Sequence, residues 1–228
     1  MPAAPPNSGT ENLRAIATRV AARFDRRLYR GYARNKLRFD PAYAAVAAHV
    51  EGSTTPLLDV GCGLGLLGFH LRECGYQGDY LGIDSDAMKV EAGNAAARGH
   101  YPRLRLLATA ASDLPAFSGH VALIDVLHYM DRDAQQQLLR EAATRVAPGA
   151  LLIIRNVVRE RGWRFRATVF EERMIHLVHW IGTPARHYPD RAEIEAPLQA
   201  AGLAVEMSPL WGRTPFNSYL VLARAPQR

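Results

Sequence analysis

A glycine-rich turn after a short apolar segment constrains this chain more than any other feature of its sequence. Residues 56–60 form a predicted buried strand, and Gly61, Gly63 and Gly65 follow at alternate positions before a helical pattern begins. Glycines so spaced let the backbone turn tightly and approach a ligand closely. Asp84 comes directly after the next predicted strand, where a carboxylate can accept hydrogen bonds from both ribose hydroxyls of a nucleoside. The segment therefore predicts a nucleoside-binding turn.

The remainder of the chain alternates between strand-like and helix-like segments. Strands are predicted at 56–60, 80–83, 105–108, 121–124, 150–154, 203–207 and 217–225. Helices are predicted at 11–35, 41–50, 66–73, 87–98, 134–146, 167–179 and 190–201. This alternation indicates an α/β fold in which helices cover both faces of a mostly parallel sheet. We expect a disordered lead-in over 1–10, an N-terminal helical cap over 11–52, and one main domain over 53–228 with a helical insertion at about 157–189.

The glycine turn fits two kinds of ligand site. Gly63 to Gly68 satisfies the GxGxxG pattern of dinucleotide-binding folds, and Asp84 lies at the expected distance. A second interpretation is favoured by Asp59 before the first glycine and by the two predicted strands after Gly202. These features resemble the class I methyltransferases. The resemblance extends firmly over 57–155. It implies a seven-stranded Rossmann-like sheet, S-adenosylmethionine as the cofactor, and an enzyme that transfers its methyl group.

The resemblance also assigns residues to the cofactor. Segments after the third and fourth predicted strands match the places where the family contacts the adenine and the methionine end, and Pro148-Gly149 matches a recurrent turn of the family. The cofactor-binding residues that it implies are Asp59, Gly61, Cys62, Gly63, Gly65, Asp84, Ser85, Ser112, Asp113 and Asp125.

Within the class I methyltransferases, the chain is most similar to small enzymes encoded in bacterial aryl-polyene and related pigment gene clusters. The segments that carry this likeness are 32–41, 125–129, 162–165, 187–188 and 214–216. Asn156 departs from the pattern, which would place an acidic residue there. The likeness implies an acceptor of secondary metabolism, a small aromatic or polyketide-type molecule that is either free or tethered to an acidic carrier protein.

Three residues are candidates for the acceptor side of the reaction. His128 and Tyr129 follow the fourth strand and are placed to face the transferred methyl group, and His187 can reach the site as a lid residue. A general base helps when the acceptor carries a proton that must leave. The alternative for His128 is simple packing beneath the loop. Aromatic residues expected around the pocket are Tyr29, Tyr32, Trp163, Phe165, Tyr188, Trp211 and Phe216.

No metal site is predicted. His176 and His179 share a helix with Glu172, but no further ligand joins them. A metal-dependent catechol-type site would need Asp125 together with an Asp-Asn pair after the fifth strand, where Arg155-Asn156 stands instead.

Composition adds limits on partners and compartment. The net charge is +6 and only two of the 28 basic residues are lysines, Lys36 and Lys89. This arginine excess leaves open an RNA methyltransferase or a non-catalytic cofactor-binding subunit, although the arginines lack interleaved aromatic platforms for nucleic acid. Two cysteines imply no disulfide framework, and no apolar run is long enough to span a membrane. A cytoplasmic enzyme is expected.

Overall fold

The computed structural model describes residues 8–177, 185–211 and 216–227, without the side chains of 8–11 and 171–177. A seven-stranded sheet forms its centre, in the order β3-β2-β1-β4-β5-β7-β6. The strands are β1 (Leu57–Val60), β2 (Tyr80–Asp84), β3 (Leu104–Ala108), β4 (His120–Ile124), β5 (Leu151–Val157), β6 (Ala204–Pro209) and β7 (Ser218–Arg224). The strands β1 to β5 are parallel, whereas β7 runs antiparallel to β5 and β6. The predicted mostly parallel, seven-stranded sheet is confirmed.

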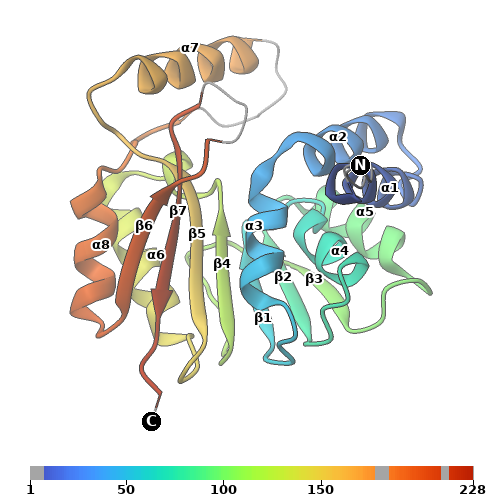
Figure 1. Ribbon diagram of the computed structural model, residues 1–228, viewed down its shortest axis with the longest axis horizontal. Helices are drawn as coiled ribbons and strands as arrows, with labels where there is room; N and C mark the ends of the chain where they lie inside the picture. The colour runs from blue at the N-terminus through green and yellow to red at the C-terminus, as the bar shows by residue number, and fades with distance from the viewer. Residues whose placement is uncertain (1–7, 178–184, 212–215, 228) are drawn as a thin grey trace, which may run out of the picture.

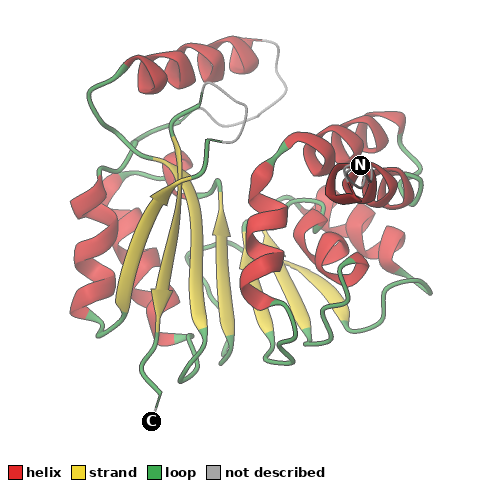
Figure 2. Ribbon diagram, in the orientation of Figure 1, coloured by secondary structure: helices red, strands yellow, loops and turns green. Residues whose placement is uncertain are grey.

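Helices lie on both sides of this sheet (Figures 1 and 2). They are α1 (Ser8–Ala21), α2 (Arg27–Phe39), α3 (Pro41–Val50), α4 (Leu66–Glu73), α5 (Ala87–Ala97), α6 (Arg132–Thr144), α7 (Trp163–Leu177) and α8 (Arg191–Ala200), with a short 3-10 turn η1 (Leu127–Tyr129). Alternate residues of one strand serve opposite faces: Leu57 packs in the core under α1 to α5, and Leu58 packs in the core under α6 and α8. α7 stands apart, beyond the carboxyl ends of the parallel strands (Figure 1).

Local sequence explains where several helices begin. Asp40 caps α3 by accepting a hydrogen bond from the Ala42 amide at 2.9 Å, and Pro41 occupies the first turn. Asp190 and Glu193 form a reciprocal capping box at the start of α8.

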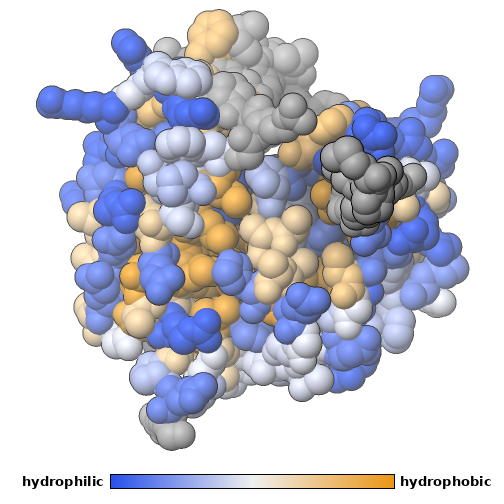
Figure 3. All heavy atoms as spheres, in the orientation of Figure 1, coloured by the Kyte–Doolittle hydropathy of each residue, from blue (hydrophilic) through white to orange (hydrophobic). Residues whose placement is uncertain are grey.

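Figure 3 shows that hydrophobic residues gather on the viewed face over β5, β6 and β7.

The single helix predicted over 11–35 is wrong. The chain forms two helices, and the first begins at Ser8, inside the segment predicted to be a disordered lead-in. The break lies around Phe24, whose buried ring packs edge-on against Phe69 at 5.7 Å. Arg30 closes the break by donating from its guanidinium to the carbonyls of Phe24 and Asp25. A helical pattern alone cannot reveal this turn, because it depends on a tertiary contact.

The segment after the fifth strand also differs from the prediction. β5 continues to Val157 through seven residues paired with β7, so it extends three residues beyond the predicted strand at 150–154 and includes Asn156. α7 begins at Trp163, four residues before the predicted helix, and lies within the segment expected to be an insertion. His179 and the pair Thr214-Pro215 lie outside the described residues.

Candidate active site

The glycine turn joins β1 to α4 at the carboxyl edge of the sheet. Gly61, Gly63 and Gly65 all have positive φ angles, between 55° and 76°, which glycine adopts without strain. The amides of Gly61 and Cys62 both donate to the Ile83 carbonyl, at 2.8 and 3.0 Å. These two bonds fix the turn against the end of β2.

The three glycines differ in what surrounds them. A Cβ at Gly61 would lie 2.4 Å from Cγ2 of Val126, and one at Gly65 would lie 2.8 Å from Cδ1 of Leu106. At Gly63 the nearest atom would be Cδ of Lys89 at 4.0 Å. Gly61 and Gly65 are therefore required by packing, whereas Gly63 faces open space where a ligand can approach the backbone.

Asp84 ends β2 directly beside this open position. Its Oδ2 accepts a hydrogen bond from the Gly63 amide at 2.7 Å, and its Oδ1 accepts one from the Asp86 amide at 2.8 Å. Ser85 is exposed at the same edge, and the loop after β3 brings exposed Ser112 and Asp113 there as well. A carboxylate oriented by backbone amides at an open edge fits the ribose contact that the sequence predicts for Asp84.

Asp59 and Cys62 lie beneath the turn. The Asp59 carboxylate is buried and accepts a hydrogen bond from the Tyr80 hydroxyl. Burial raises its pKa to about 7, although the Tyr80 bond acts in the opposite direction. The half-buried Cys62 side chain packs so closely on Gly82 that a Cβ there would lie 2.7 Å from Sγ. The geometry places both residues as supports of the turn from the core side.

A cluster of four charged residues lies next along the carboxyl edge of the sheet. Lys36 of α2 places its Nζ 2.7 Å from Asp40 Oδ2 and 3.2 Å from Asp125 Oδ2. Arg155 of β5 pairs with Asp125 and lies 3.8 Å from Asp40 Oδ1. We call Lys36, Asp40, Asp125 and Arg155 the charge cluster. It joins the helical cap to the ends of β4 and β5.

The charges of this cluster hold one another ionised. Burial would raise the pKa of Asp125, but attraction to Arg155 and Lys36 lowers it below its ordinary value. Burial would likewise lower the pKa of Lys36, and Asp125 and Asp40 raise it well above its ordinary value. Asp125, predicted at the cofactor's methionine end, has a φ of 59° directly after β4, so its backbone turns sharply at the end of this strand.

His128 and Tyr129 follow on η1, at the same edge. The His128 ring is buried, and its Nδ1 lies 3.1 Å from Oδ1 of Asn156. Tyr129 contacts this ring with centroids 4.1 Å apart, and Tyr188 stacks nearly parallel to it at 6.1 Å. Phe165 of α7 packs edge-on against Tyr188 at 5.4 Å. An aromatic cluster therefore surrounds the predicted catalytic histidine.

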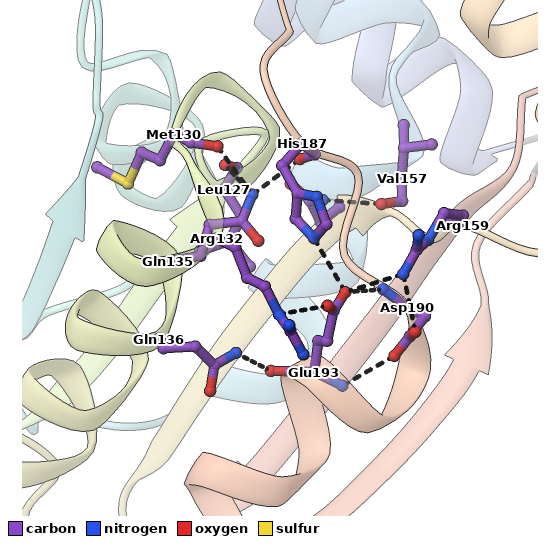
Figure 4. Close-up of polar contacts among 11 residues, drawn as sticks. Leu127, Met130, Arg132, Gln135, Gln136, Val157, Arg159, His187, Asp190 and Glu193 are labelled. Carbon is purple, nitrogen blue, oxygen red and sulfur yellow. Dashed lines mark hydrogen bonds and ion pairs between the residues drawn. The ribbon is translucent and has the colours of Figure 1, made fainter.

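The backbone amide of His187 donates to the carbonyl oxygen of His128 at 3.4 Å. The His187 ring points toward Glu193 (Figure 4). Its Nε2 is 3.0 Å from Glu193 Oε2, at the start of α8. Glu193 also pairs with Arg132 at 2.8 Å and with Arg159 at 3.4 Å. This arrangement favours a structural role for the His187 ring over the predicted role as a catalytic lid residue.

Gln135 holds the same corner together from α6. Its buried amide nitrogen lies 2.7, 3.1 and 2.8 Å from the carbonyl oxygens of Leu127, Met130 and His187 (Figure 4). The segment that carries Tyr188 is thereby tied to the loop that carries His128. Neither Gln135 nor the link between Lys36 and Asp125 was predicted from the sequence, because neither follows a motif and both join distant segments.

The other aromatic residues expected at the pocket divide into different environments. Trp211 lies beside Tyr219 and beneath the guanidinium of Arg164, which is 4.4 Å from its ring centroid. Trp163 is 60% exposed, so it does not line a closed pocket. Tyr29 and Tyr32 pack against the core of the cap, and Phe216 is half-buried.

Among the described residues, no group of three or more histidine, cysteine or acidic side chains lies together as a metal site would require. Within the same part of the chain, no helix combines the length and apolar character needed to cross a membrane.

Comparisons with known proteins agree with this geometry. Residues 57–149, which carry the glycine turn, Asp84 and His128, match the family model described as a methyltransferase domain. This part of the chain is similar to a methyltransferase domain. S-adenosylmethionine is the cofactor of such a domain, and the open position at Gly63 beside Asp84 fits a nucleoside. A comparison with curated protein sequences finds no match.

Solved structures share the methyltransferase fold. A protein from Nostoc punctiforme, described as a candidate O-methyltransferase, has a TM-score of 0.65 and 21% identity over 86% of this chain and 59% of its own length. Mitomycin 7-O-methyltransferase has a TM-score of 0.66 and 20% identity over 86% of this chain and 56% of its own. The cyclase SpnF has a TM-score of 0.66 and 17% identity over 95% of this chain and 94% of its own. The chain thus spans less than two thirds of the length of both O-methyltransferases.

Proposed function

We propose that this chain transfers a methyl group from S-adenosylmethionine to a hydroxyl group of a small aromatic or polyketide-type metabolite. The observation that carries the proposal is the pairing of an open glycine, Gly63, with a carboxylate oriented by backbone amides, Asp84, at the edge that also holds His128. The first two residues suit the ribose of the cofactor. The third suits an acceptor that must lose a proton.

The chain's own residues have three tasks in this proposal. The glycine turn and Asp84 bind the nucleoside, with Ser85, Ser112 and Asp113 near the adenine. When bound, the cofactor supplies an electrophilic methyl group. The aromatic cluster around His128 excludes water and orients the acceptor, which matters because alignment supplies much of the rate in such a displacement. His128 receives the acceptor's proton, and Tyr129 orients the ring beside it.

The proposed acceptor class rests on similar solved structures as well as on the candidate active site. Two structural neighbours are described as O-methyltransferases, one of them acting on mitomycin, which favours an oxygen nucleophile on a small ring system. We propose a role in bacterial secondary metabolism, such as an aryl-polyene gene cluster, with the acceptor free or tethered to an acidic carrier protein. The free thiols of Cys62 and Cys74 suit the reducing cytoplasm, where we place the enzyme.

Calorimetry with S-adenosylhomocysteine tests the cofactor half of the proposal. Asp84→Ala should weaken binding at least about tenfold, because it removes a charged acceptor of ribose hydroxyl bonds. Asp79 precedes the same strand at its opposite end and pairs with exposed Arg103 at 2.6 Å, so Asp79→Ala is the matched control and should bind like the wild type. Equal affinities for both variants would refute the assignment of Asp84.

Transfer of a labelled methyl group tests the acceptor half. The wild type is incubated with methyl-labelled cofactor and a small-molecule extract, and the labelled product is isolated and its methylated atom identified. We expect a methyl ether on an aromatic or polyketide product, and a much lower yield with His128→Gln at unchanged cofactor affinity. Label on nitrogen or carbon alone would refute the proposed oxygen acceptor.

A second candidate, methylation of RNA, is favoured by the surface of α2. Arg27, Arg30, Arg34 and Arg38 are exposed there, and 26–39 contains no acidic residue. RNA binding through such a surface would weaken steeply as salt is raised. Salt-dependent binding together with methyl-labelled RNA would select this function over the small-molecule one.

A third candidate is a cofactor-binding subunit without transfer activity of its own. It is suggested by two neighbours with the same fold, the cyclase SpnF and a complex of a candidate methyltransferase with an activator protein from Haloferax volcanii. Tight binding of the cofactor without transfer to any extract fraction would favour it.

A further inference from the structure

Asn156 occupies a buried position on β5, where the sequence pattern leads one to expect an acidic residue. Its amide group lies between two partners of different kind. On one side is the carbonyl oxygen of Val157, 2.8 Å from Nδ2, and on the other is the ring of His128, with Nδ1 3.1 Å from Oδ1. Asn156 is 1% exposed, so neither partner can be exchanged readily for solvent.

The chemistry of these partners decides which way the amide faces. A backbone carbonyl can only accept, so the NH₂ group of Asn156 must face Val157. Its carbonyl oxygen must therefore face His128, and this oxygen also only accepts. The hydrogen shared between Asn156 and His128 must then belong to the ring, so Nδ1 carries it. In the neutral imidazole the lone pair consequently lies on Nε2.

We infer that Asn156 is a positioning residue that fixes His128 as the Nδ1–H tautomer, so that Nε2 accepts the proton of the acceptor hydroxyl. The catalytic part of this inference rests on the proposed function. As the acceptor's O–H bond breaks, its electron pair forms the bond to the methyl carbon, the carbon–sulfur bond breaks with its pair left on sulfur, and the proton passes to Nε2. Asn156 continues to accept from Nδ1–H in the resulting imidazolium.

A neutral partner suits this position better than a carboxylate. Among the described residues, the titratable groups that face His128 are Asp125, Tyr129 and Tyr188, and Asp125 already attracts a protonated ring. A second carboxylate at 156 would stabilise the imidazolium further and keep the ring protonated at higher pH. Asparagine sets the same tautomer without adding a negative charge beside the ring.

Nitrogen NMR of the imidazole tests the inference without any acceptor. In ¹⁵N-histidine-labelled protein, His128→Gln assigns the His128 signals, and long-range proton correlations show which ring nitrogen carries hydrogen. We expect Nδ1–H in the wild type and in Asn156→Asp, and a large gain of Nε2–H in Asn156→Leu. Asn217→Leu is the matched control, because Asn217 is also buried and donates to the next carbonyl along, that of Val158 at 2.8 Å. It should leave the tautomer unchanged.

The pH dependence tests the catalytic part. Asn156→Asp should raise the His128 pKa by about one unit or more, seen by NMR titration and as the same shift in the acidic limb of the rate profile. An Nε2–H tautomer in the wild type would overturn the inference, whatever the protein methylates. An unmoved acidic limb in an active Asn156→Asp enzyme would overturn the proton transfer to Nε2. A wild type that carries the expected tautomer but transfers no methyl group would instead refute the proposed function.

Discussion

The charge cluster gives the sharpest stability prediction, because the chain's two lysines form a natural pair of test sites. Lys36 lies between Asp40 and Asp125, with 27% of its side chain exposed. Lys89 pairs with Asp86 at 3.1 Å, with 47% of its side chain exposed. Replacing each by methionine keeps most of the apolar part of the side chain and removes the ammonium group. The two substitutions therefore compare a half-enclosed ammonium group with a solvated one.

The distances set the size of the expected difference. At an effective dielectric constant of about 20, Coulomb's law gives roughly 5–6 kcal/mol of attraction for each contact of Lys36. Removing the ammonium group from water costs several kcal/mol and offsets much of this. We expect Lys36→Met to lower the free energy of unfolding by about 2–4 kcal/mol, because two carboxylates are left with Arg155 alone. For Lys89→Met the expected loss is about 0–0.5 kcal/mol.

Urea unfolding at neutral pH measures both values, and a double-mutant cycle isolates the pair. Asp40→Asn is the second substitution, because asparagine retains the N-cap of α3 while the charge is lost. Lys36 and Asp40 should couple by about 1–2 kcal/mol. A Lys36→Met protein as stable as the wild type, or a coupling near zero, would show that desolvation cancels the attraction and that the charge cluster does not hold the cap.

Four other substitutions test the turn and the buried titratable groups by urea unfolding. Gly61→Ala should lower the free energy of unfolding by about 2–4 kcal/mol, because its φ is positive and a methyl group of Val126 would lie 2.4 Å from the new Cβ. Gly63→Ala should lower it by only about 1 kcal/mol, because only the positive φ opposes it. Equal losses would contradict the packing argument. Burial lowers the pKa of His70 from 6.5 to about 4, so the unfolded chain takes up this proton at a higher pH than the folded one. The free energy of unfolding should therefore fall by up to about 3 kcal/mol as the pH drops from 6.5 to 4. His70→Gln should flatten this pH dependence, and an unchanged pH dependence would refute the assignment. Burial raises the pKa of Asp59 to about 7, so its effect has the opposite sign and stability is lost as the pH rises toward 7. The stability of Asp59→Asn relative to the wild type should therefore increase by about 1–3 kcal/mol between pH 4 and pH 8. The absence of this increase would place the carboxylate in solvent.

Features that depend on neighbouring residues in the chain could be predicted from the sequence. The strand before Gly61 and the helix after Gly65 follow from an apolar run, glycines at alternate positions and a resumed helical pattern, and the structure has both. The helix predicted at 41–50 likewise begins at Pro41, directly after the N-cap Asp40. These signals are local, so a single sequence contains them in full.

Features that depend on contacts between distant segments could not be predicted. Lys36 meets Asp125 across 89 residues, and neither neighbourhood carries a pattern that names the other. The break at Phe24 depends on Phe69, and the ring of His187 turns toward Glu193 because α8 begins beside it. Asn156 appeared only as a departure from an expected acidic residue. Its role follows from its hydrogen bond to the carbonyl of Val157, which no sequence pattern specifies.

Three aspartates show why residue type and position along a strand do not determine a role. Asp59, Asp84 and Asp125 lie within or just beyond the carboxyl ends of β1, β2 and β4, and the sequence interpretation assigned all three to the cofactor. Asp59 is buried against the Tyr80 hydroxyl, and its raised pKa favours an internal hydrogen bond over a ligand contact. Asp125 is held ionised by Arg155 and Lys36, so its charge is largely compensated inside the protein. Asp84 alone is oriented by backbone amides that add no full charge, beside an open glycine. Of the three, it therefore keeps the greatest capacity to bind a new partner, and we propose the ribose contact for this residue.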